Sequence, residues 1–133
     1  MPLSEEVYFR GIIPRCLKEE FSAGAVVLLS VLIFGVGHIA AAFSEINGLE
    51  IALTVLNAFI FSWLAMEMTF ISGNIIPAVL VHFLFDFETK IVAMDAESLL
   101  AAEGVRGALM FVAGGWLTVT AYRRRHTAQA AEN

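Results

Sequence analysis

Apolar residues are concentrated in four stretches that are separated by short polar segments. The stretches cover about residues 21–43, 49–71, 75–87 (up to 94 if a polar break is included) and 105–122. Three of them approach the roughly 20 residues that a helix needs to cross a bilayer. The third is shorter and carries His82 and Asp86. Because strand-like alternation is lacking and irregular backbone cannot face lipid, the pattern predicts an all-α, polytopic transmembrane helix bundle with about four membrane-embedded helices.

A shorter N-terminal helix is expected before the first stretch, over about residues 5–20, where apolar and basic residues are mixed. Ser4 is a suitable N-cap, and Glu5 and Glu6 suit the positive end of the helix dipole. Pro14 predicts a kink in this helix, because proline removes a backbone donor.

The connections between the apolar helices are predicted to be short, except for an acidic loop over about residues 88–104. Residues 1–122 are expected to form a single domain, and residues 123–133 a basic, disordered tail. Arg123–Arg125 directly follow the last apolar stretch. Because Lys and Arg accumulate on the cytoplasmic side of membrane proteins, we expect the C-terminus to lie in the cytoplasm. The chain itself is expected to be an integral membrane protein of a bacterial or archaeal cytoplasmic membrane.

The composition agrees with a lipid environment. Hydrophobic residues make up 59% and charged residues 16% of the 133 residues, against about 45–50% and 25% in soluble domains. The net charge of −5, without a basic stripe and interleaved aromatic residues, argues against nucleic-acid binding. Cys16 is the single cysteine, which excludes an internal disulfide and a cysteine-based zinc site.

Ionisable side chains inside apolar segments are costly and are therefore candidates for function. In the N-terminal helix, Glu6 and Arg10 lie about 40° apart around the axis at 3.6 residues per turn, so they can pair. Glu5 lies about 140° from Arg10 and cannot share that face. An ordinary acidic helix start followed by a surface ion pair is the alternative interpretation.

Histidines mark two more such places. His38 follows Phe34 by four residues and has glycines nearby that permit close helix approach. A hydrogen bond to a neighbouring carbonyl explains this histidine as well as a function does. His82 and Asp86 lie one turn apart on one helix face, and a structural pair that bridges two helices is the alternative for them.

Taken together and in order, these motifs resemble the signature of the CPBP family of intramembrane endopeptidases, which includes CAAX proteases and bacteriocin-processing proteins. That family carries Glu-Glu-x-x-x-Arg, Phe-x-x-x-His and His-x-x-x-Asn/Asp, each on its own helix. The matching segments here are Glu5–Arg10, Phe34–His38 and His82–Asp86, with Arg10-Gly11 and Gly73–Pro77 as matching context. The resemblance covers about residues 4–87, roughly two-thirds of the chain.

Two features depart from the family pattern. Asp86 stands where the eukaryotic prenyl-protein endopeptidases have Asn. Asp is common at this position among bacterial relatives of the family. Family members usually carry several helices before the glutamate pair, so the chain is expected to be a minimal or a truncated member.

The resemblance implies an intramembrane endopeptidase that hydrolyses a peptide bond of a membrane-associated or lipidated protein or peptide with an activated water. Glu5 is then the general base and His38 assists it. Glu6 and Arg10 orient the first helix. The expected partners are the bilayer and a substrate with a membrane-associated C-terminal or leader segment.

For the other residues the resemblance implies that His82 polarises the scissile carbonyl, while Asp86 fixes the tautomer of His82 or binds water. Phe34 binds substrate or supports the site. We favour a mechanism without a cofactor, and a zinc-dependent version of the same protease is the alternative, with ligands Glu5, His38, His82 and Asp86. A catalytically inactive scaffold or immunity protein of the same family is a further alternative. A proton-coupled carrier is disfavoured because no inverted repeat is present.

Overall fold

The computed structural model describes residues 2–42, 48–91 and 96–132, and the elements in these ranges are helices. They are α1 (Pro2–Glu6), the π-helix η1 (Val7–Ile12), α2 (Ile13–Leu17), α3 (Ala23–Ala42), α4 (Gly48–Ser72), α5 (Ile76–Ile91) and α6 (Ala96–Glu132). The all-α prediction is therefore confirmed for the described part of the chain.

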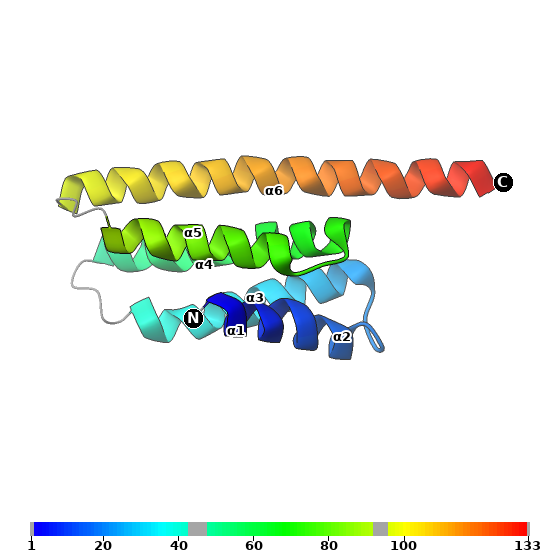
Figure 1. Ribbon diagram of the computed structural model, residues 1–133, viewed down its shortest axis with the longest axis horizontal. Coiled ribbons are helices and arrows are strands. Elements are labelled where there is room, and N and C mark those ends of the chain that lie inside the picture. The colour runs from blue at the N-terminus through cyan, green and yellow to red at the C-terminus, as the bar shows by residue number, and fades with distance from the viewer. Residues whose placement is uncertain (1, 43–47, 92–95, 133) are drawn as a thin grey trace.

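Helix α4 is the centre of the bundle (Figure 1). It packs against α3 on one side and against α6 on the other. Helix α5 lies beside α4 and also contacts α1, while α2 packs against the start of α3. The N-terminal helix is thus wedged between α3 and α5, which are the helices that carry the two histidine motifs.

The N-terminal helix is continuous from Pro2 to Leu17, but its middle third is wider than an α-helix. It begins at Pro2 rather than after Ser4. Proline is tolerated in the first turn of a helix because the N–H groups there have no partner within the helix. The backbone N–H of Ile13 donates to the carbonyl of Tyr8, five residues back. The irregularity predicted at Pro14 therefore appears just before the proline, as a π-helical segment of the kind that often accompanies functional sites.

Helices α5 and α6 reach well beyond the apolar stretches that predicted them. Helix α5 continues to Ile91 and α6 begins at Ala96, so the predicted loop over 88–104 is wrong for all its described residues. Helix α6 also continues through Glu132, where the sequence predicts a disordered tail. Hydropathy marks only the part of a helix suited to lipid, whereas Ala, Glu, Gln and Arg continue the helix with good intrinsic propensity.

Among the described residues, two helices are long and apolar enough to cross a membrane, over Gly48–Ser72 and Glu97–Arg123, and a shorter apolar helix covers Ala23–Ile39. The predicted number of about four embedded helices stays a prediction. Large apolar side chains face outward on α6, where Leu109, Val112 and Trp116 are each about two-thirds exposed. Exposed apolar area of this kind marks an interaction surface, here one suited to lipid.

Helix α3 packs tightly against α4 at Gly35. A Cβ atom built at this position would collide with the ring of Phe59, so only glycine permits this contact without rearrangement. The core that surrounds it is formed by Phe34, Ala58, Phe61, Leu64, Ala65, Ala78 and Met110. Gly37 has open space around it, so the close approach expected around His38 occurs on one side only.

A short connection, Ser72–Asn74, is predicted between the second and third apolar stretches. In the structure α4 includes Ser72, and residues 73–75 form a tight turn that sets the start of α5. Gly73 has a φ of 67°, a left-handed conformation that glycine adopts at the end of a helix. Asn74 Oδ1 then accepts a hydrogen bond from the backbone N–H of Ile76 at 2.9 Å and caps α5. This turn fixes the direction in which α5 leaves, and with it the position of His82.

Candidate active site

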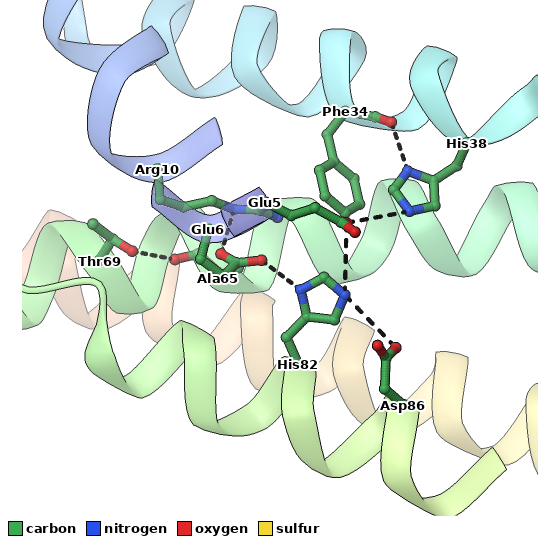
Figure 2. A network of polar contacts seen from close by, with 9 residues as sticks. All are labelled: Glu5, Glu6, Arg10, Phe34, His38, Ala65, Thr69, His82 and Asp86. Carbon is green, nitrogen blue, oxygen red and sulfur yellow. Dashed lines mark hydrogen bonds and ion pairs between the residues drawn. The ribbon is translucent and has the colours of Figure 1, made fainter. Parts of the chain in front are cut away.

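Glu6 connects the N-terminal helix to α5. Its side chain is 0% exposed, and its two carboxylate oxygens face different partners. Oε2 lies 3.1 Å from Nε of Arg10, and Oε1 lies 2.7 Å from Nδ1 of His82 (Figure 2). The predicted Glu6–Arg10 pair is confirmed. The contact with His82 was not predicted.

His82 has its ring orientation set by Glu6. Since a carboxylate only accepts hydrogen bonds, Nδ1 is the donor, and Nε2 is left facing the centre of the site. Nε2 lies 3.9 Å from Oε2 of Glu5 and 3.8 Å from Oδ1 of Asp86. The family resemblance implied that Asp86 fixes this tautomer or binds water. The short hydrogen bond that fixes it comes from Glu6 instead.

His38 is oriented in the same way by a different acceptor. Its Nδ1 donates to the backbone carbonyl of Phe34 at 3.0 Å, and its Nε2 lies 3.9 Å from Oε2 of Glu5. Two imidazoles from α3 and α5 therefore direct their Nε2 atoms toward one carboxylate oxygen from α1 (Figure 2). With Asp86, these side chains lie near one another although they are far apart in the sequence.

Phe34 packs against both His38 and Arg10. It is 1% exposed, its ring stacks on the imidazole of His38 with centroids 4.2 Å apart, and the guanidinium carbon of Arg10 lies 4.2 Å from its centroid. Phe61 covers His82 at 4.7 Å. These contacts assign Phe34 a supporting role, because it restrains both His38 and Arg10.

Arg10 is a buried cation. It is 3% exposed, lies outside the two candidate membrane spans, and its Nη atoms have no hydrogen-bond partner among the described residues. Burial lowers the pKa of Arg10 to about 10, against the opposing effect of Glu6 and then Glu5. The guanidinium is thus charged at neutral pH, and the carboxylate of Glu6 is its principal counter-charge.

A cavity of about 340 Å³ opens beside the cluster, and we call it the catalytic cavity. His82 and Asp86 line one wall, and Arg106 and Glu103 of α6 line another, together with Asn57 of α4. The side-chain amide of Asn57 donates to Oε2 of Glu103 at 2.6 Å and to its backbone carbonyl at 3.1 Å. Glu103 in turn forms an ion pair with Arg106, so the guanidinium is held in place at the cavity wall.

Glu103 and Arg106 were not predicted as site residues. Glu103 lies in the segment predicted as a loop, and Arg106 lies within the last apolar stretch. Their opposite charges three residues apart are the signal that could have found them, because this spacing places both on one helix face.

Among the described residues, no group of three or more His, Cys, Asp or Glu side chains is placed to hold a metal ion. Of the four side chains proposed as zinc ligands, Oε2 of Glu5 lies 3.9 Å from Nε2 of His38 and 3.9 Å from Nε2 of His82. The zinc-dependent alternative therefore stays a prediction.

The described elements are helices, two of them long and apolar enough to cross a membrane, and they bring carboxylates and histidines from three helices together. The family model for the type II CAAX prenyl endopeptidase Rce1-like proteins matches residues 1–87, which include all three motifs. The chain therefore belongs to this family of proteases, and the CPBP assignment made from the motifs is confirmed. No curated protein and no solved structure matches the chain. Together with the two apolar helices, the family indicates a membrane protein.

Proposed function

We propose that the chain is an intramembrane endopeptidase that cleaves a membrane-associated or lipidated protein or peptide, with Glu5 as the general base. The observation that carries this proposal is the approach of two Nε2 atoms, from His38 and His82, to Oε2 of Glu5 at 3.9 Å each. Such separations are too long for direct hydrogen bonds and suit groups that act through one water.

The two glutamates are suited to different tasks. The side chain of Glu6 is 0% exposed and both of its oxygens face buried partners, so it cannot readily take a proton from water. The side chain of Glu5 is 33% exposed and lies between the two histidines. This contrast supports Glu5 as the base and Glu6 as the residue that positions Arg10 and His82.

In the proposed reaction Glu5 takes a proton from water as the water oxygen attacks the scissile carbonyl carbon. His38 holds that water through Nε2. His82, in its protonated form, donates from Nε2 to the carbonyl oxygen as negative charge develops there. The C–N bond then breaks, and Glu5 returns its proton to the leaving amine. Asp86 binds the water or the departing amine.

A neighbouring apolar cavity favours a substrate that carries an apolar segment. It has a volume of about 540 Å³ between α5 and α6, and it shares Phe85, Arg106 and Met110 with the catalytic cavity. An apolar chain bound there would place an adjoining peptide beside His82. Arg106, at the junction of the two cavities, is positioned to hold a carbonyl or carboxylate of that peptide.

Cleavage of a quenched fluorescent peptide by purified protein in detergent tests the proposal. The peptide carries a prenylated cysteine near a free C-terminus, and a second peptide lacks the prenyl group. Wild type should cleave the prenylated peptide, and Glu5→Gln should lower the rate by about 10²–10⁴-fold, as loss of a general base does. Glu20→Gln removes an exposed acid outside the cavity and serves as the matched control.

A chelator arm separates the two mechanisms. Cleavage that is unchanged by the chelator supports glutamate-activated water. Cleavage that is lost with the chelator and restored by zinc supports the metal-dependent alternative. If folded wild-type protein cleaves neither peptide, the endopeptidase proposal fails for this class of substrate.

A further inference from the structure

A separate cavity of about 340 Å³ lies where α2, the start of α3 and the end of α4 meet. We call it the basic cavity. Its walls are mostly apolar and include Val26 and Met66, each 1% exposed, and the exposed ring of Phe70. None of the catalytic histidines lines it.

The charged residues of the basic cavity are all cations. Arg10 is the buried one, at 3% exposed, and has Glu6 as its partner. Arg15 on α2 and Lys18 directly after it are exposed. None of the described residues that line the cavity is acidic. Glu19 and Glu20 follow in the connection to α3 but do not line it. Two exposed cations without a lining acid favour an anionic ligand.

The cavity lies at the end of an apolar helix rather than at its middle. The candidate span of α4 ends at Ser72, only two residues beyond Phe70. The other candidate span ends at Arg123, and both helices end on the same side of the bundle (Figure 1). Span ends lie at the level of lipid headgroups, where juxtamembrane Lys and Arg attract anionic lipids.

We propose that the basic cavity binds one anionic phospholipid, with its phosphate near Arg15 and Lys18 and an acyl chain along the apolar wall. The apolar lining favours a lipid over free phosphate, because a bare phosphate would leave that wall without a partner. This inference does not rest on the proposed proteolysis. It links lipid to the catalytic cluster through one residue, because Arg10 lines the cavity and also pairs with Glu6.

Lipid binding to the purified protein can be measured by native mass spectrometry and by thermal unfolding in detergent. The probes are phosphatidylglycerol, phosphatidylcholine with the same acyl chains, and inorganic phosphate. The test variant is Arg15→Gln/Lys18→Gln, which changes two exposed positions outside the catalytic cluster. The control is Arg123→Gln, which removes an exposed cation at the end of the second candidate span.

We expect phosphatidylglycerol to bind wild type and Arg123→Gln with similar affinity and to raise the Tm of both. The double variant should bind it about 30-fold more weakly, given the contribution of each cation near an anionic surface, and should have a normal Tm in phosphatidylcholine. Equal binding by the double variant and wild type would overturn the proposal, since it would show that Arg15 and Lys18 do not hold the lipid. Equal weakening by Arg123→Gln and the double variant would also overturn it, since it would show a general surface-charge effect. Protection of wild type by inorganic phosphate to the same extent as by phosphatidylglycerol would overturn the lipid as the ligand.

Discussion

Replacing Glu6 by glutamine tests how the cluster formed by Glu5, Glu6, Arg10, His38 and His82 is held together. Oε1 of Glu6 accepts from Nδ1 of His82 at 2.7 Å, and Oε2 lies 3.1 Å from Nε of Arg10. A glutamine at this position can still accept from His82 through its amide oxygen. It has no charge to offer Arg10, so the substitution removes one half of a buried ion pair and leaves the other half in place.

The expected loss of stability is large because water has little access to the cation. Arg10 is 3% exposed, and removing one partner of a buried ion pair costs about 3–5 kcal/mol. For a chain of this length, each kcal/mol lowers Tm by about 4 °C. Glu6→Gln should therefore lower the Tm by roughly 12–20 °C.

Thermal unfolding in detergent, followed by circular dichroism, measures this loss. Glu20→Gln is the matched control, because it removes an exposed acid, and exposed substitutions usually change stability by less than about 0.5 kcal/mol. The double variant Glu6→Gln/Arg10→Met removes both charges and should recover most of the loss, since an apolar replacement of a buried pair is often neutral.

Two results would refute the reasoning. A Tm of Glu6→Gln within about 2 °C of wild type would show that the buried pair contributes no net stability. A double variant no more stable than Glu6→Gln would show that the loss arises elsewhere than from the unpaired cation. Furthermore, if Glu6→Gln is folded and inactive while Glu5→Gln cleaves at the wild-type rate, the roles proposed for the two glutamates are reversed.

Gly35→Ala should lower the free energy of unfolding by about 1–3 kcal/mol, because its Cβ meets the Phe59 ring. Gly37→Ala has open space and should be neutral or stabilise by up to about 1 kcal/mol; equal effects in thermal unfolding would contradict the packing of α3 on α4. Arg106→Gln should lower kcat/KM for the prenylated peptide about tenfold or more, as loss of a charged hydrogen bond does, and unchanged kinetics would remove Arg106 from the substrate path. A tag at the C-terminus should be protected from an impermeant label in intact cells, because Arg123–Arg125 follow the last apolar stretch; labelling from outside would reverse the orientation.

The parts of the site that sequence predicted well are those that depend on helical spacing. The Glu6–Arg10 pair follows from four-residue spacing within one helix, and so does the placing of His82 and Asp86 on one face. The short turn before α5 was also predictable, because Gly73 and Asn74 are typical of a helix end and a helix cap.

Contacts between different helices could not be predicted from residue spacing within one helix. Glu6 and His82 are 76 positions apart, and their contact depends on how α1 packs on α5, which no local periodicity encodes. Glu103 was not predicted because hydropathy places the start of the last helix at about residue 105, where its apolar residues begin, whereas α6 begins at Ala96. The π-helical turn of η1 likewise has no periodic signal, since apolar and polar residues are mixed along it.

The division of the cluster among three helices makes activity conditional on assembly. Glu5 and Glu6 come from α1, whereas His38 belongs to α3 and His82 to α5, so none of these helices alone brings a base and both imidazoles together. On the proposed mechanism, a chain whose N-terminal helix has not docked has histidines but no base. A newly inserted, partly folded molecule would then not cleave neighbouring membrane proteins. The proteolytic activity would begin only when the sixteen N-terminal residues from Pro2 to Leu17 dock onto the other helices.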